Sequence, residues 1–258
     1  MTSAAVILAA VVGAAVLCGL AYLIAATWTA APILNALPRG VLAARCAQYV
    51  AVIAVGIGAS VLVTTAFGHV VQAHAVTRPD RAVYRDVVTN RTAWLTHLAS
   101  HLTGAGNQWA QLVVAVVLGL ALALWLQAPR VLVVLGLCIL VEIELQKQMG
   151  HLVHSVKPAV ATSIGDPGGY PSGGVTRVLL TFGIAAVFVG ARGPVKQRQW
   201  LIAGATGLAC IEAFSRLYLG RHWPVDILGA FVLGGCLLAT VAAAETVRGR
   251  PVPKPSLG

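Results

Sequence analysis

The sequence predicts an all-α integral membrane protein, folded as a polytopic bundle of about seven membrane-spanning helices. Of its 258 residues, 58% are hydrophobic and only 10% are charged, and the mean hydropathy of +0.84 is far above that of soluble domains. Apolar runs of about 20 residues, the length that crosses a bilayer, recur along the chain. Arginine and lysine gather in the short gaps between these runs. Lipid is therefore the solvent for most of the chain.

Seven apolar stretches have the length of a membrane span. They cover Ala4–Thr27, Tyr49–Phe67, Trp109–Leu126, Val131–Met149, Val175–Gly190, Trp200–Leu219 and Ile227–Ala244. The third and fourth are separated only by Gln127–Arg130, which predicts an antiparallel helical hairpin. The first lacks a basic segment before it, so we interpret it as a retained span and not as a cleaved signal peptide. The polar stretch Val87–Leu102 predicts one amphipathic helix on the membrane surface.

The positive charge of the chain is assigned to membrane topology. In a soluble protein a net charge of +10 suggests nucleic-acid binding. Here the basic residues of the short loops all fall on one side of the predicted spans, so membrane topology accounts for the charge and no nucleic-acid partner is expected. That side is predicted to be cytoplasmic, and the C-terminus with it. Segment 68–108, loop 154–174 and the turn around His222 then lie outside. The composition, rich in Ala, Val, Gly, Leu and Arg, indicates a bacterial source and the cytoplasmic membrane.

The most specific motif lies between the last two predicted spans. Ser215 and Arg216 are followed by His222 and, four residues later, by Asp226. This string resembles the third signature of the type-2 phosphatidic acid phosphatase family, SR-x5-H-x3-D, and its chance occurrence in the chain is on the order of one in a thousand. The resemblance implies that His222 attacks phosphorus to give a phosphohistidine. A carboxylate at Asp226 would fix the imidazole tautomer and stabilise the developing imidazolium.

Two further signatures of the family are present in altered form. Its PSGH string corresponds to Pro171-Ser172-Gly173-Gly174, so that glycine replaces the usual histidine. Its K-x6-RP string falls on the end of the fourth span, with Gly150 at the lysine position and Lys157 at the arginine position. The resemblance covers roughly residues 85–245 and implies a lipid phosphatase-like membrane domain with a six-helix core. Residues 1–84 then form an N-terminal addition and the start of the outer segment, and 246–258 a cytoplasmic tail.

Phosphate binding needs positive charge and N–H donors around the phosphate oxygens. Arg216 matches the family's phosphate-binding arginine, and Ser172, Gly173 and Gly174 open a helix whose free N–H groups favour an anion. Lys157 replaces the family's arginine or, alternatively, anchors at lipid headgroups. Arg177 either supplies the missing charge or extends to the membrane surface. Glu212, four residues before Arg216, is expected to form a buried ion pair that orients the guanidinium.

The sequence offers three substitutes for the missing lysine and histidine. Lys147, His151 and His154 lie near the outer end of the fourth span at i, i+4 and i+7, and therefore share a helix face. No metal cluster is apparent, and neither a metal nor another cofactor is expected.

The missing histidine bears on the substrate. In the family this residue is the general acid, which an alkoxide leaving group needs because its conjugate acid has a pKa of about 16, by analogy with water. A phosphate leaving group, with a pKa near 6, does not need it. The sequence therefore favours a lipid diphosphate, such as a polyprenyl diphosphate, over a lipid monophosphate, and it predicts that Gly174→His raises monophosphate turnover. A noncatalytic lipid-phosphate-binding protein and a lipid phosphotransferase are the alternatives, and the oligomeric state stays unassigned.

Overall fold

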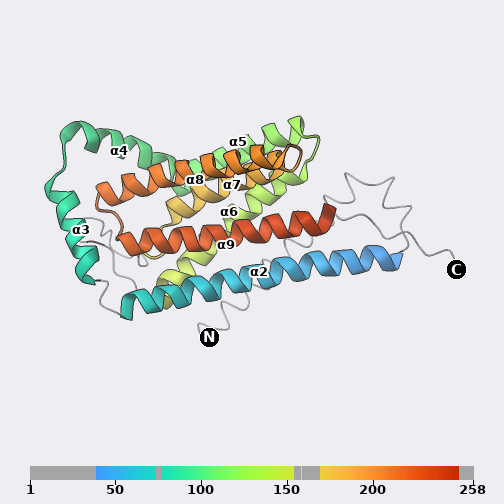
Figure 1. Cartoon of the computed structure of the whole chain (residues 1–258), viewed down its shortest axis with the longest axis horizontal. Helices are drawn as coiled ribbons and strands as arrows, with labels where there is room; N and C mark the ends of the chain where they lie inside the picture. The colour runs from blue at the N-terminus through green and yellow to red at the C-terminus, as the bar shows by residue number, and fades with distance from the viewer. Residues whose placement is uncertain (1–38, 74–76, 154–157, 159–168, 250–258) are drawn as a thin grey trace.

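The computed structural model describes residues 39–73, 77–153, 158 and 169–249, and within these residues the chain forms eight helices and no strand. The prediction of an all-α fold is confirmed. The helices are α2 (Arg39–Ala73), α3 (Thr77–Thr89), α4 (Ala93–Ala105), α5 (Gln108–Trp125), α6 (Arg130–Val153), α7 (Gly173–Gly190), α8 (Val195–Tyr218) and α9 (Pro224–Gly249). The long helices lie side by side as a bundle, and α3 and α4 lie across one end of it (Figure 1).

Five of the described helices are long and apolar enough to cross a bilayer. They are the Cys46–Val71 part of α2 together with α5, α7, α8 and the Pro224–Arg248 part of α9. The predicted fourth span forms a helix, α6, but is not among the five because it carries Glu142, Glu144 and Lys147. The predicted span Ala4–Thr27 lies outside the described residues. Each of these helices extends past its predicted apolar run at one end or both.

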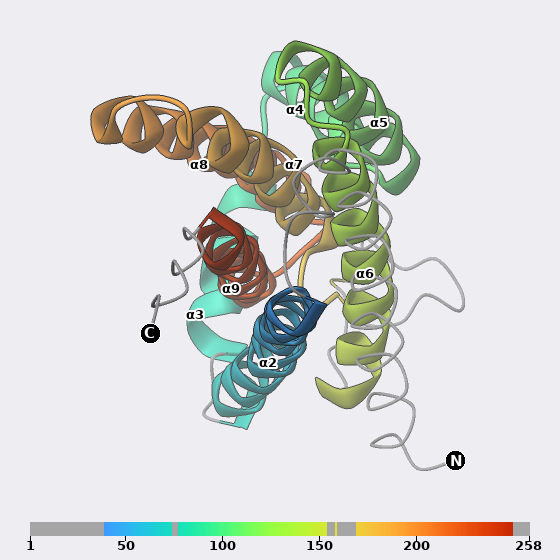
Figure 2. The same cartoon turned by 90° about the vertical axis from the view of Figure 1, so that its right-hand side faces the viewer.

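Helix α7 is the centre of the bundle. It packs against α5, α6, α8 and α9, and Figure 2 shows it enclosed between α6, α8 and α9. Of its 18 residues, 14 are buried, as expected for a helix that is apolar all round. Leu180 and Ile184, both completely buried, belong to the main hydrophobic core. Because α7 is held on all sides, its first residues are a fixed platform for a site at that end.

Close helix packing depends on small residues. A Cβ atom added to Gly56 of α2 would lie 2.3 Å from the side chain of Thr240 on α9, so only glycine allows the two backbones to approach this far. The predicted hairpin between α5 and α6 is confirmed, because α5 ends at Trp125 and α6 begins at Arg130. Gln127 has a φ of 51° in this turn, and the N–H of Ala128 donates to the carbonyl of Ala123 at 2.9 Å.

The single surface helix predicted for Val87–Leu102 is wrong. The chain instead ends α3 at Thr89 and starts α4 at Ala93. Asn90 stops the first helix, because its side-chain amide donates to the carbonyl of Asp86 at 2.8 Å, and Thr92 is extended. The break is held by tertiary contacts, since the N–H of Thr92 donates to the hydroxyl of Tyr218 at 2.7 Å. Local amphipathic pattern cannot reveal such a contact.

The two ends of the bundle hold different groups. At the end away from α3 and α4, Arg130 and Arg248 each lie 3.4 Å from the Glu245 carboxylate, and Arg192 donates to the carbonyl of Leu126. These residues belong to the loops that the sequence predicts to be cytoplasmic. The other end holds the starts of α7 and α9 and the end of α8, where the candidate catalytic residues lie.

Exposed tryptophans lie at both ends of α5. Trp109 and Trp125 are 73% and 66% exposed, and the 18 residues of α5 span about 27 Å at 1.5 Å per residue. Since the hydrocarbon layer is about 30 Å thick and tryptophan prefers its two boundaries, the helix has the length and the anchors of a transmembrane segment.

Candidate active site

The end of α8 directs the chain into the candidate site. Gly220 adopts a φ of 65°, the left-handed conformation that ends helices, and the N–H of Arg221 then donates to the carbonyl of Arg216 at 2.9 Å. This turn reverses the chain so that His222, two residues after the glycine, faces back toward the last turn of α8. A Cβ atom at position 220 would also lie 2.7 Å from the guanidinium of Arg91. Glycine is required here both for conformation and for space.

Asp226 fixes both the start of α9 and the ring of His222. Its Oδ2 atom accepts a hydrogen bond from the N–H of Trp223 at 3.0 Å, which satisfies a free donor at the helix start. The same oxygen lies 3.4 Å from Nδ1 of His222. One carboxylate thus both stabilises the start of α9 and lies beside the imidazole. With Nδ1 turned to Asp226, the other ring nitrogen of His222 is directed to the site.

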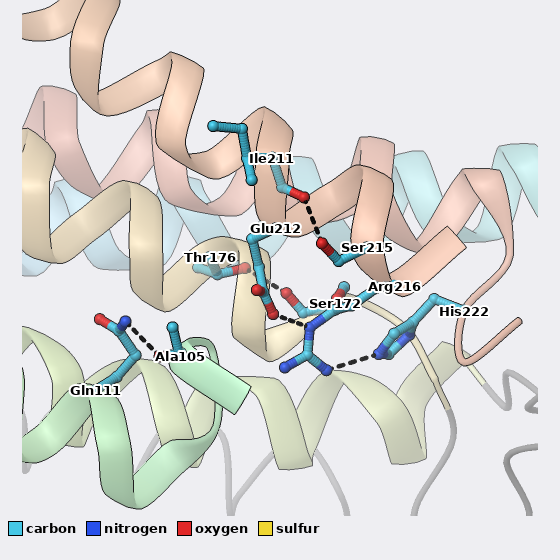
Figure 3. Close-up of polar contacts among 9 residues, drawn as sticks. All are labelled: Ala105, Gln111, Ser172, Thr176, Ile211, Glu212, Ser215, Arg216 and His222. Atoms are coloured by element: carbon cyan, nitrogen blue, oxygen red, sulfur yellow. Dashed lines mark hydrogen bonds and ion pairs between the residues drawn. The ribbon is translucent and has the colours of Figure 1, made fainter. Parts of the chain in front are cut away.

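Arg216 is held in a fixed direction next to that nitrogen. Its Nε donates to the Glu212 carboxylate, which confirms the predicted ion pair, and its Nη1 lies 3.5 Å from Nε2 of His222. Figure 3 shows the guanidinium between Glu212 and His222. All three side chains are buried. Because Glu212 occupies Nε, the two terminal nitrogens remain for an anion that lies against the imidazole.

The start of α7 supplies the second wall of the site. The N–H of Ser172 donates to the carbonyl of Asp226 at 3.0 Å, which joins the two loops through their backbones. Ser172 is completely buried, and its hydroxyl has no hydrogen-bond partner among the described residues. The N–H groups after it lack carbonyl partners one turn earlier, as at any helix start. Helix N-termini of this kind attract anions.

Gly174 lies directly under the Arg216 guanidinium. A Cβ atom at this position would be only 2.2 Å from Nη2 of Arg216 and 2.3 Å from its central carbon. The glycine that replaces the family histidine therefore creates the space in which the Arg216 guanidinium lies. The sequence identified the loss of an acid here, whereas the space it creates follows only from the three-dimensional structure.

Arg177 points into the protein and not to the membrane surface. It is 6% exposed, and its Nη1 lies 3.1 Å from a carboxylate oxygen of Glu142, which is completely buried on α6. The same nitrogen lies 2.8 Å from the position of a Cβ atom at Gly173. Of the two sequence interpretations of Arg177, surface extension is therefore wrong, and the buried charge lies beside the start of α7.

The proposed substitutes on α6 are not brought to this cluster. Lys147 and His151 are exposed, and none of the contacts in the described part of the chain joins them to His222, Arg216 or Gly174. The inward face of α6 at this level presents Glu142 and Gln146, whose amide oxygen lies 2.6 Å from the position of a Cβ atom at Gly173. His154 and Lys157 lie outside the described residues. Gln146 carried no signal in the sequence.

Helix α3 contributes a support that the sequence did not reveal. Asp80 is buried near the start of α9, and burial together with the charge of Asp226 raises the pKa of its carboxyl to about 6. The ring of Tyr84 lies 5.0 Å from that of Trp223. Arg91 donates from Nε to the carbonyl of Tyr218 at 2.8 Å. These residues pack against the loop that carries His222 and hold it from behind.

Another cavity in the described structure lacks the groups that bind phosphate. It lies between α2, α6 and α9 and is lined mostly by apolar side chains such as Ile53, Val134 and Leu237. No group of three or more metal-binding side chains occurs among the described residues. The cluster around His222 is therefore the candidate site.

Comparisons with known proteins identify the family and agree with the fold. Residues 49–250 match the PAP2 superfamily. The chain is 34% identical over 135 residues to "Putative undecaprenyl-diphosphatase YbjG" of Escherichia coli (strain K12), an alignment that covers 47% of this chain and 64% of that protein. It is 26% identical over 169 residues to Phosphatidylglycerophosphatase B of Bacillus subtilis (strain 168), covering 64% and 82%.

A solved structure has the same fold. The crystal structure of a transmembrane PAP2-type phosphatidylglycerolphosphate phosphatase from Bacillus subtilis superposes with a TM-score of 0.64 at 23% identity, covering 74% of this chain and 96% of that one. Both sequence relatives carry the names of phosphatases, in agreement with the predicted class of phosphoric ester hydrolase.

Proposed function

Because the chain belongs to the PAP2 superfamily, we propose that it is a membrane phosphatase that removes phosphate from a lipid at the extracytoplasmic face of the membrane. The observation that carries the proposal is the position of His222, with Asp226 on one ring nitrogen and Arg216 beside the other. A nucleophile needs a partner that fixes its tautomer, and a phosphoryl group needs positive charge around its oxygens. Both requirements meet at this one side chain.

The proposed reaction has two steps. Nε2 of His222 attacks the terminal phosphorus of the lipid, the bond from phosphorus to the leaving oxygen breaks, and a phosphohistidine forms while Asp226 balances the charge of the imidazolium. Arg216 and the N–H groups that follow Ser172 hold the oxygens of the phosphoryl group. Water then attacks the phosphohistidine, which releases inorganic phosphate and restores the imidazole.

A polyprenyl diphosphate is the preferred substrate in this proposal. Its leaving group is a phosphate, which departs without a proton donor at neutral pH, and position 174 has no side chain to donate one. Neither Lys147 nor His151 contacts the described cluster, so neither compensates for the loss from its present position. The resemblance to a relative named as an undecaprenyl-diphosphatase supports the same substrate class.

The proposed orientation rests on the basic residues of the short loops at one end of the bundle. Arg130, Arg192 and Arg248 lie at the end away from His222, and basic residues in short loops favour the cytoplasm. Single cysteines at Arg221 and at Lys196, both exposed positions, test it in a background without native cysteines. A membrane-impermeant maleimide is expected to label Arg221→Cys in intact cells and Lys196→Cys only after permeabilisation. The reverse pattern would contradict the orientation.

The proposed activity is tested with purified protein in detergent. Phosphate release is measured from a diphosphate and a monophosphate that share one polyprenyl tail, so that partitioning into micelles cancels. Without a substitute acid, the diphosphate is expected to be cleaved about a hundredfold faster, since general acid catalysis is worth about 10²–10⁴ in rate. Equal rates would contradict the substrate preference. Binding of both lipids without phosphate release would favour the noncatalytic alternative.

A further inference from the structure

We propose that Arg177 binds the second phosphate group of a diphosphate substrate, beside the first phosphate group held by Arg216. The inference rests on the proposed function and specifies its substrate. The inference is based on two buried guanidinium groups, those of Arg216 and Arg177, which lie beside two adjacent glycines at the start of α7. One lies over Gly174 and the other beside Gly173.

The spacing fits a diphosphate. Nη2 of Arg216 is 2.2 Å from a Cβ position at Gly174, and Nη1 of Arg177 is 2.8 Å from a Cβ position at Gly173. Consecutive Cα atoms are about 3.8 Å apart. The two cations therefore lie beside neighbouring backbone positions, and in this proposal each contacts one of two linked phosphates. Both glycines are needed, because a side chain at either position would occupy the space of a guanidinium.

The donors at this point are not all used within the protein. Nε of Arg177 is buried and has no hydrogen-bond partner among the described residues, and the same holds for the completely buried hydroxyl of Ser172. Buried donors are nearly always satisfied in folded proteins. Two unsatisfied donors at one helix start, whose N–H groups already favour anions, indicate a site for an anionic ligand.

Each arginine has its own glutamate. Glu212 holds Arg216 from one side, and Glu142 holds Arg177 from α6. A carboxylate that occupies one edge of a guanidinium leaves another edge for phosphate and fixes its direction. Glu142 is thus a positioning residue in this proposal. The Arg216 pair already offers a buried cation to one phosphate group, and the Arg177 pair offers a second buried cation that a ligand with two phosphates can use.

The alternative is that Arg177 only neutralises the buried charge of Glu142. The two cases separate in the double variant Arg177→Gln/Glu142→Gln, which removes both charges and leaves no carboxylate unpaired. Binding of inorganic pyrophosphate and of inorganic phosphate is measured by calorimetry on purified protein. Wild type is expected to bind pyrophosphate roughly tenfold or more tightly than phosphate, as one added charge-assisted contact predicts. The double variant should lose most of this difference while its phosphate affinity stays within about threefold.

A matched control and a milder variant complete the test. The double variant Arg130→Gln/Glu245→Gln removes an ion pair of the same type at the other end of the bundle, and its pyrophosphate preference should equal that of wild type. Arg177→Lys keeps a charge opposite Glu142 but loses the planar fork, and it is expected to lose part of the preference. A preference for pyrophosphate that is unchanged in both Arg177 variants overturns the proposal.

Failure of this inference differs from failure of the proposed function. If wild type hydrolyses the lipid diphosphate and the double variant keeps the same ratio of diphosphate to monophosphate turnover, Arg177 is structural and the inference is overturned. If no lipid is hydrolysed but the pyrophosphate preference is present in wild type and lost in the double variant, the second phosphate position is supported without the catalytic function.

Discussion

The two walls of the candidate site have diverged to different degrees from the family pattern. The wall from the end of α8 to the start of α9 keeps every residue of the third signature, and its His222 lies next to both Asp226 and Arg216. The wall formed by α6 and the start of α7 has lost the lysine and the histidine of the other signatures. It carries the buried pair Arg177–Glu142.

This difference indicates which part of the chemistry is retained. The intact wall holds the groups that would form and break the bond to phosphorus. In our proposal the altered wall recognises the substrate, and its position 174 corresponds to the residue that protonates the leaving group in the family. A change confined to the altered wall is what a change of leaving group from an alkoxide to a phosphate requires. The attack on phosphorus stays the same, whereas a proton donor for the leaving group is no longer needed.

The largest expected effect tests the intact wall. His222→Ala should reduce phosphate release by on the order of 10⁴-fold or more, as for other nucleophiles, while the purified protein keeps its thermal stability. His151→Ala, at an exposed histidine of α6, is the matched control and should retain wild-type rates. Activity that survives in His222→Ala but not in His151→Ala would reverse the comparison between the walls.

The next effect separates the two roles of Asp226. Asp226→Asn removes the carboxylate from the imidazole and is expected to lower kcat by on the order of 10²–10⁴-fold through the wrong tautomer. Its amide oxygen can still accept the hydrogen bond from Trp223, so the start of α9 should persist in circular dichroism spectra. A rate that stays within threefold of wild type would mean that Asp226 serves only the helix start.

The third prediction concerns the altered wall and revises the expectation from sequence. Gly174→His was expected to restore an acid, but its Cβ atom would lie 2.2 Å from the Arg216 guanidinium. Since Arg216 is held by Glu212, the new side chain must displace a phosphate-binding group, and turnover of both substrates should fall by on the order of 10²-fold.

Two glycine variants sharpen this prediction. Gly174→Ala adds only the Cβ atom and is expected to lose much of the same activity. Gly136→Ala, at a helix position with open space around it, should have no effect. A selective gain of monophosphate turnover in Gly174→His would show instead that Arg216 moves aside without loss of function.

Sequence predicted the bundle and the intact wall well, for a physical reason. In lipid every backbone polar group must be satisfied within the chain, so apolar runs of sufficient length become helices. The third signature lies within twelve consecutive residues, Ser215–Asp226, and a turn at Gly220 is enough to bring His222 to Arg216.

The altered wall could not be predicted in the same way. Arg177 lies on α7, Glu142 and Gln146 lie on α6, and their contact depends on how the two helices rotate against each other. Sequence left Arg177 equally open to an inward and an outward position. Likewise, the break between α3 and α4 depends on Tyr218, more than 120 residues later, so the local pattern alone favoured one continuous helix.

The smallest expected effect tests the support behind the intact wall. Burial and the neighbouring charge of Asp226 raise the pKa of Asp80 to about 6 from an ordinary value of 3.8. The folded protein therefore binds this proton more tightly than the unfolded chain does, and the resulting stabilisation is complete below about pH 4 and is lost as the pH rises through 6. Asp80→Asn, which cannot ionise, should gain stability over wild type at pH 8 relative to pH 5, by at most about 1.5 kcal/mol, since about half of the effect of ionisation is already present at pH 5. Unfolding in detergent at both pH values measures this, with Asp86→Asn, exposed on the same helix, as the control. An equal change in stability for Asp80→Asn at both pH values would mean that the Asp80 carboxyl titrates alike in the folded and unfolded chain. The charge of Asp226 on α9 would then have no effect on Asp80 on α3.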